Sequence, residues 1–346
     1  MNQLLPPPLP ELVTLPVTVR SRSTVLKRLA SFAVALVAWT WRWLGGAAMC
    51  FNFFILSWIT SIIAVGWTNR VVQMVVLRCW WWRSPVRDAL TFSEFCASLG
   101  PDAPSPRPRW FLRNHLRTYV RRPKNGKPPG LFTRIRRILL SPVQSLWLNF
   151  KLGIKATFCT YALTGLPCLL MLWSWEQGWI NSFHGGYEQA WLGPTMGFLG
   201  IFVFVGVMFY VPMAQAHQAA TGQARAFFDF HFVWRLVRAR ITAYVILAMM
   251  IGVWSLLLNA TRFVVLTETF QANAAPTPEE GLTQFAWYLF KLSLCMFPVY
   301  VLLRIFGGLV YQSAVMKALR RGTVTRSEVH PTLRAWLDAL QLKIVP

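Results

Sequence analysis

Residues 196–214 read MGFLGIFVFVGVMFYVPMA, a run without one charged side chain. A helix rises 1.5 Å per residue, so about 20 such residues cross the roughly 30 Å hydrocarbon layer of a bilayer. Residues 154–175, 241–265 and 282–303 form similarly long apolar runs. The sequence therefore predicts an all-helical, multi-pass integral membrane protein with four clear transmembrane helices.

The composition of the chain also indicates that lipid is part of its surroundings. Hydrophobic residues make up 55% of the 346 residues and charged residues only 14%, whereas about 25% are charged in an ordinary soluble domain. The formal net charge is +23, which is typical of proteins that bind nucleic acid or an anionic membrane surface. Because basic segments alternate with apolar runs, membrane lipid is the expected partner and nucleic acid is not.

The charges between the apolar runs predict how the protein is oriented. Lys and Arg gather in the cytoplasmic connectors of membrane proteins. Connectors 175–195 and 267–281 contain Glu and no Lys or Arg, whereas connector 215–240 and the tail 313–346 are rich in Arg. We expect the two acidic connectors outside, and the basic connector and the C-terminus in the cytoplasm.

The apolar stretch 31–67 does not fit this scheme directly. As one helix it would be about 55 Å long, too long for a straight crossing. Either it forms a hairpin or re-entrant segment hinged at Gly45–Gly46, or residues 29–44 lie in the interface and only 47–67 cross. The hairpin keeps the basic, proline-rich tail 1–30 inside, as the charge bias favours.

Residues 68–153 form the most basic part of the chain, a predicted cytoplasmic loop. Proline-rich breaks at 100–106 and 122–130 predict short interfacial helices joined by turns. In residues 109–122 (RWFLRNHLRTYVRR), arginines four residues apart share one helix face. Such a helix lies at the lipid headgroups with its arginines toward the phosphates. Residues 131–140 (LFTRIRRILL) and 75–83 (VVLRCWWWR) repeat this pattern.

This loop supplies the candidate residues for binding anionic lipid or a protein partner. They are Arg109, Trp110, Arg113, Arg117, Arg121, Arg134, Arg136 and Arg137. The alternative is a solvated loop whose charges only set the topology. Aromatic residues between the arginines also occur in nucleic-acid grooves, but no recognised nucleic-acid module is present.

Ionisable and helix-breaking residues in the last span are the second group of candidates. Lys291 lies midway along residues 282–303, and Arg304 follows their end. Charge inside a membrane is costly and by default indicates function, although Arg304 is close enough to the interface to snorkel. Pro298 interrupts the same span, as prolines do in many transport pathways. No Asp or Glu lies at matching depth, so a proton relay has no acidic partner.

Motifs of enzymes and of metal or cofactor sites are missing from the sequence. The six cysteines form no CxxC pair, and the five histidines are dispersed without metal spacing. No P-loop, dinucleotide fingerprint or nucleophile elbow occurs. We expect no catalytic residue, no metal, no cofactor and no enzymatic activity.

The last third of the chain carries a family resemblance. Residues 209–238 (FYVPMAQAHQAATGQARAFFDFHFVWRLVR) combine the end of a span, a glycine turn and an aromatic helix start at which Asp229 is the expected cap. Together with residues 302–322 (LLRIFGGLVYQSAVMKALRRG), they resemble an uncharacterised bacterial family of polytopic membrane proteins, a domain of unknown function. The resemblance implies a bacterial inner membrane and no activity, and the front half of the chain departs from it.

Residues 331–344 (PTLRAWLDALQLKI) carry apolar side chains at helical spacing after Pro331. They predict an amphipathic helix that docks on the membrane, on a partner or, as the default, on the protein itself. The predicted regions are the tail 1–30, the apolar segment 31–67, the basic loop 68–153, the four-helix region 154–312 and the cytoplasmic tail 313–346.

Two functions fit these features. The first is a non-enzymatic membrane scaffold or accessory subunit whose basic cytoplasmic face binds anionic lipid or an acidic protein partner, and which can join other membrane proteins in a complex. The second is a transporter or permease component with a pathway near Lys291.

Overall fold

The computed structural model describes residues 35–46, 56–99, 104–106, 108, 131–184, 192–254, 257 and 277–342. The chain divides into the units Met1–Trp39 and Thr40–Pro346. Of the first unit, residues 35–39 are described and are helical. The helices and contacts that follow belong to the second unit, in which every described element is helical.

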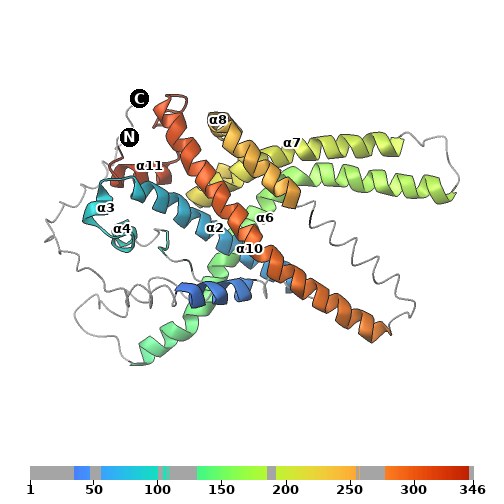
Figure 1. The fold of residues 1–346 in the computed structure, drawn as a ribbon, viewed down its shortest axis with the longest axis horizontal. Helices are drawn as coiled ribbons and strands as arrows, with labels where there is room; N and C mark the ends of the chain where they lie inside the picture. Colours follow the sequence, from blue (N-terminus) through green and yellow to red (C-terminus); the bar gives the residue numbers. More distant parts are fainter. Residues whose placement is uncertain are drawn as a thin grey trace, which may run out of the picture. The chain divides into compact units, whose positions relative to one another are not determined.

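Four helices are long and apolar enough to cross a membrane (Figure 1). They are α2 (Leu56–Trp82), α6 (Leu131–His184), α7 (Leu192–Thr221) and α10 (Pro278–Arg320). A fifth candidate is a bent pair, in which Phe230–Ala239 and Ile241–Trp254 meet at 100°. For the described residues, the prediction of an all-helical protein with helices long and apolar enough to span a membrane is confirmed. Three of the four predicted spans lie in α6, α7 and α10, and the run 241–265 begins in the bent pair.

Sequence signals set where several helices begin and end. Thr277 and Glu280 form a capping box at the start of α10, with Pro278 as its first residue. Asp229 caps α8 (Phe230–Ala239) by accepting a hydrogen bond from the Phe232 backbone N–H at 3.2 Å, which confirms the predicted cap. Gly222, with φ +73°, supplies the left-handed turn that ends α7.

The best-packed part of the protein lies where α2, α7 and α10 finish. The shorter helices α3 (Val86–Ala89), α4 (Phe92–Ser98), η2 (Ala224–Phe228), α8 and α11 (Pro331–Ala339) surround these ends. We call this part the compact end. Its fully buried side chains include Leu77, Trp80, Met213, Phe227, Leu236, Tyr311, Leu333 and Leu337. α11 begins at Pro331 and buries its apolar face in this core.

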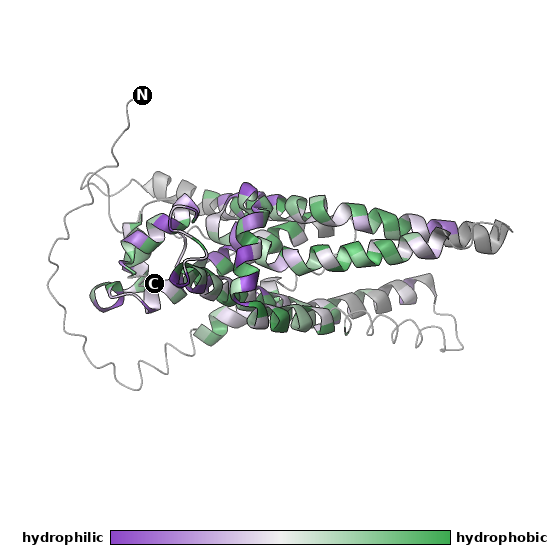
Figure 2. Ribbon diagram, turned by 90° about the horizontal axis from the view of Figure 1, so that it is seen from above, coloured by the Kyte–Doolittle hydropathy of each residue, from purple (hydrophilic) through white to green (hydrophobic). Residues whose placement is uncertain are grey.

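Outside the compact end, the long helices expose large apolar side chains. Only 22% of the apolar windows of α6 and α7, and 17% of that of α10, is buried within the protein. Phe158, Leu166, Phe198 and Phe202 are among the exposed residues, and Figure 2 shows hydrophobic residues along these helices. Water is a poor solvent for such a surface, which is typical of helices covered by lipid or by another membrane protein.

The structure differs from the sequence-based division at α2. This helix continues past Trp67 to Trp82, so the predicted loop starting at residue 68 is helical over its first part. Val76, Leu77 and Trp80 are buried in the core of the compact end. The prediction that the apolar side chains of residues 75–83 lie in lipid was therefore wrong for Val76, Leu77 and Trp80, because an apolar run rich in Trp fits a protein core as well as an interface.

The path of residues 31–67 stays a prediction. Residues 35–46 are helical, including both glycines of the predicted hinge, and α2 begins at Leu56. Residues 47–55 lie outside the described part. Within the second unit, the Trp43 Nε1–H donates to the Leu294 carbonyl oxygen of α10 at 2.8 Å, which fixes one end of the short helix against α10.

Candidate functional site

Polar side chains meet between α2, α6, α7 and α10 where the spans enter the compact end. Arg304 lies at their centre. Its Nη2–H donates to Asn69 Oδ1 at 2.5 Å and its Nη1–H donates to Gln215 Oε1. The Gln215 Nε2–H donates in turn to Thr160 Oγ1 at 2.9 Å. One chain of hydrogen bonds therefore connects all four helices, and we call these four residues the polar layer.

A second buried pair joins α2 to α6 beside the polar layer. Arg70, which is 8% exposed, donates from Nη1 to Oδ1 of the fully buried Asn149 at 2.9 Å. The pair forms where Gly66 of α2 and Gly153 of α6 allow the two backbones to approach closely. The glycines bring the helices together, and the hydrogen bond fixes their register.

The acceptors of Arg304 are amide oxygens rather than carboxylates. Both Asn69 and Gln215 are neutral, so their hydrogen bonds satisfy the guanidinium without cancelling its charge. An arginine taken from water is costly unless its donors are satisfied. In the part of the chain that the structure describes, no salt bridge joins Arg304 to a carboxylate. The arrangement is that of a fixed connection between helices.

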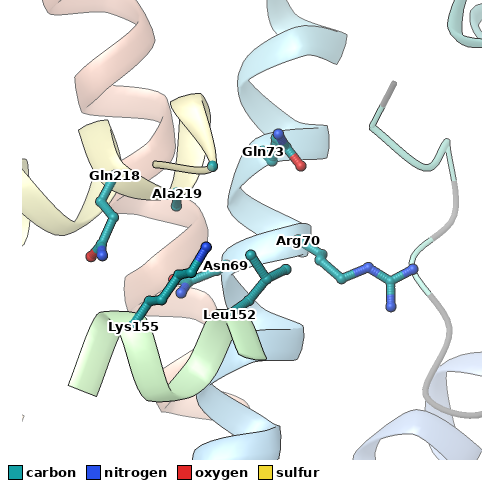
Figure 3. A pocket seen from close by; sticks show the side chains of 8 residues that line it. Asn69, Arg70, Gln73, Leu152, Lys155, Gln218 and Ala219 are labelled. Carbon is teal, nitrogen blue, oxygen red and sulfur yellow. The ribbon is translucent and has the colours of Figure 1, made fainter. Parts of the chain in front are cut away.

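A small pocket adjoins this layer (Figure 3). Its lining residues are Asn69, Arg70, Gln73, Leu152, Lys155, Gln218, Ala219 and Gly222. Its free volume of about 20 Å³ is enough for one water molecule, and too small for an organic substrate. The amide of Gln218, 4% exposed, donates to Cys159 Sγ at 3.5 Å, while its Oε1 has no partner among the described residues. Figure 3 shows Lys155 beside Asn69, whereas Arg70 extends away from both.

The predicted intramembrane residues are separated rather than gathered. Arg304 belongs to the polar layer. Lys291 is exposed on α10, about 20 Å from Arg304 along the helix at 1.5 Å per residue. Pro298 is half-buried inside α10, which continues through it as one helix, and its neighbour Phe297 packs against Trp67 with ring centroids 5.9 Å apart.

The predicted lipid-binding residues stay predictions. Arg109, Trp110, Arg113, Arg117 and Arg121 lie outside the described residues. Arg134, Arg136 and Arg137 fall in the first turns of α6, and the structure describes their backbone only. The pattern of arginines on one helix face is therefore neither supported nor contradicted.

Sequence reasoning missed the partners of Arg304. Asn69 and Gln215 directly follow the predicted ends of two apolar runs, so they were assigned to loops. The sequence does carry a signal for these partners. Asn69 and Gln73 are four residues apart, and Gln215 and Gln218 are three residues apart, so each pair would share one face of a helix that continues past the apolar run.

Positive charge dominates the surface of the compact end. Four of its five described carboxylates are engaged within the protein: Glu328 pairs with Arg235 at 2.9 Å, Asp338 pairs with Arg326, Glu94 closes a capping box and Asp229 caps α8. The fifth, Asp88 of α3, is exposed. Hydrogen bonding to Arg235 lowers the pKa of Glu328 to about 2. The exposed basic residues are Arg78, Arg83, Arg87, Arg225, Arg238, Arg240, Arg320 and Arg321.

Metal-binding groups and similarity to known proteins were the two other possible sources of information on function. Among the residues that the structure describes, no group of three or more His, Cys, Asp or Glu side chains could hold a metal ion. Comparison with family models, with curated proteins and with solved structures finds no match. The features that bear on function are therefore the polar layer, the exposed apolar helices and the basic compact end.

Proposed function

We propose that the protein is a non-enzymatic scaffold or accessory subunit of a bacterial inner membrane, whose basic cytoplasmic face binds anionic lipid. The observation that carries this proposal is the charge of the compact end. Four of its five described carboxylates are engaged by arginines or helix caps, while Arg78, Arg83, Arg87 and further arginines remain exposed. The orientation rests on the basic connectors of the sequence.

The long helices support the scaffold part of the proposal. They present apolar side chains over most of their surface and enclose a pocket only large enough for water. Such a surface is suited to lateral contact with lipid or with other membrane proteins. Because the polar layer holds its side chains in mutual hydrogen bonds, it stabilises the arrangement of the helices.

The predicted arginine-rich face of residues 109–122 belongs to the same proposal. A basic residue near an anionic surface contributes about 1 kcal/mol to binding. Four arginines on one helix face would therefore hold this segment firmly on the membrane, in a manner that salt weakens.

Lipid retained by the purified full chain tests the proposal. The wild type and an Arg109→Gln/Arg113→Gln/Arg117→Gln/Arg121→Gln variant are extracted in mild detergent, and bound phosphatidylglycerol and cardiolipin are quantified. We expect several-fold less anionic lipid on the variant and unchanged phosphatidylethanolamine. Equal anionic lipid on both proteins would contradict lipid binding by this segment. Loss of a copurifying acidic protein instead of lipid would identify a protein partner.

The alternative of a transport pathway near Lys291 has a separate test. A pathway requires water at this position, so a cysteine replacing Lys291 would react with a membrane-impermeant reagent. We expect no reaction, because the exposed side of α10 at this level is apolar, with Trp287 and Leu302 also exposed.

A further inference from the structure

A sharp bend separates α8 from the helix Ile241–Trp254. The two helices meet at 100°, and Arg240 lies at the corner as the residue that ends α8. The second helix exposes Ile241, Met249 and Val253, as a membrane-spanning helix does. If this helix stands across the bilayer, α8 lies along the membrane surface and Arg240 lies at the depth of the lipid headgroups.

The two faces of α8 agree with this placement. Its inner face buries Phe232, Val233 and Leu236 in the core of the compact end. Its outer face exposes Phe230 and Trp234, four residues apart on the helix. Trp side chains such as Trp234 are enriched at the boundary between headgroups and acyl chains, because the indole ring is apolar but carries a polar N–H. Phe230 adds apolar surface beside it.

Hydrogen bonds fix the bend to the neighbouring helices. The Tyr244 hydroxyl donates to the Phe209 carbonyl oxygen and so holds the second helix against α7. Arg235 of α8 donates to the Thr323 carbonyl oxygen at 3.0 Å and pairs with Glu328, which holds α8 against the turn after α10. The corner is therefore positioned from two sides.

Three positive charges converge at this corner. Arg240 ends α8 at the bend, and Lys317 and Arg321 lie in the last turn of α10 and directly after it. The hydrogen bond from Arg235 to the Thr323 carbonyl oxygen joins α8 to this end of α10, and the charges of Arg240 and Arg321 both act on Lys317. Arg240 and Arg321 are exposed and Lys317 is half-buried. Among the described residues, no salt bridge joins any of the three to a carboxylate. Like charges held together destabilise one another, and an anion bound between them removes that cost.

The geometry points to a binding site for the phosphate headgroup of an anionic lipid, formed by Arg240, Lys317 and Arg321 at the bend. The guanidinium groups present donors in the fork geometry that phosphate oxygens match, and the ammonium adds a point charge. A lipid fits better than free phosphate because the apolar face of Ile241–Trp254 begins at the same corner and can receive its acyl chains. This assignment rests on the proposed orientation and lipid binding, and it adds a site separate from residues 109–122.

Affinity for a defined lipid tests the assignment. The full chain is purified in mild detergent and titrated with headgroup-intact phosphatidylglycerol in mixed micelles, and binding is followed through tryptophan fluorescence. The site variant is Arg240→Gln/Lys317→Gln/Arg321→Gln. The matched control, Arg78→Gln/Arg83→Gln/Arg87→Gln, removes the same charge from α2 and α3. We expect the site variant to weaken binding at least tenfold. The control removes the same number of charges from the basic face without touching the bend, so it should weaken binding by no more than about threefold.

Each other outcome has a definite meaning. Equal binding by the site variant and the control would overturn the assignment, whereas a loss confined to the Arg109–Arg121 variant would still uphold the proposed function. Unchanged binding by all variants would contradict both. If millimolar inorganic phosphate displaced phosphatidylglycerol as strongly as added unlabelled lipid does, the site would bind free phosphate, and the assignment to a lipid headgroup would be overturned. The site variant should unfold at the same temperature as the wild type, because removing like charges from the surface does not destabilise the fold. This measurement verifies that the variant is folded.

Discussion

Replacing Gly66 with alanine is expected to push α2 away from α6. A Cβ atom at Gly66 would lie 1.7 Å from the Asn149 carbonyl oxygen, and one at Gly153 would lie 1.8 Å from the Ile62 carbonyl oxygen. Such contacts are essentially never closer than 3.0 Å, so the two backbones must separate by about 1.3 Å. Backbone atoms cannot rotate away as a flexible side chain would.

The size of the effect follows from two losses and one gain. Overpacking of a tight contact costs about 1–3 kcal/mol. Separation also weakens the buried Arg70–Asn149 hydrogen bond, and a hydrogen bond to a charged group contributes about 1.5–3 kcal/mol. Alanine regains about 0.5–1 kcal/mol as the better helix former. We expect the free energy of unfolding to fall by about 2–4 kcal/mol for Gly66→Ala, and similarly for Gly153→Ala.

Unfolding of the full chain in mild detergent, by heat or by added dodecyl sulfate, measures this change. Gly165→Ala is the matched control, because it lies in α6 with no atom within 4 Å of the added Cβ. The control should match the wild type or exceed its stability by about 0.5–1 kcal/mol. Equal stability of Gly66→Ala and Gly165→Ala would refute the close crossing of α2 and α6.

Three further outcomes are expected. Arg304→Ala should lower the free energy of unfolding by about 1–3 kcal/mol, because it leaves the amide oxygens of Asn69 and Gln215 without their donor; Arg304→Lys should lose less in the same assay. Hydrogen bonding to Arg235 lowers the pKa of Glu328 to about 2. The ion pair between these residues therefore stabilises the fold above pH 4.5, and this stabilisation is lost as the pH falls toward 2. Glu328→Gln should make the unfolding temperature depend less on pH between these values. Burial raises the pKa of the Cys96 thiol to about 12. Mass spectrometry should therefore find Cys96 unmodified after the folded protein is treated with a maleimide at pH 7. Modification of Cys96 before unfolding would contradict its burial.

The long helices were predictable because their apolar runs are long enough to cross a bilayer. Residues 154–175 and 196–214 fall within α6 and α7, and length together with hydropathy is sufficient to find them. The end of α2 was not predictable in this way. Residues 75–82 mix Arg with Trp, and only the tertiary contacts of Trp80 and Leu77 show that they enter a protein core.

The candidate site was predictable only in part. The cost of a charge near an apolar span singled out Arg304. Its partners come from helices far apart in the sequence, and a single sequence does not show which polar residues meet. The same reasoning ranked Lys291 higher because it lies deeper in the span, but depth does not tell which side of a helix faces the protein.

The side of the membrane on which each end lies tests the central claim most directly. In a background without other cysteines, Glu188→Cys marks the connector between α6 and α7, and Ser327→Cys marks the compact end. Intact cells are treated with a membrane-impermeant maleimide before and after permeabilisation. We expect Glu188→Cys to react in intact cells and Ser327→Cys only after permeabilisation. Reaction of both from the same side would contradict a membrane-spanning protein with its basic compact end in the cytoplasm.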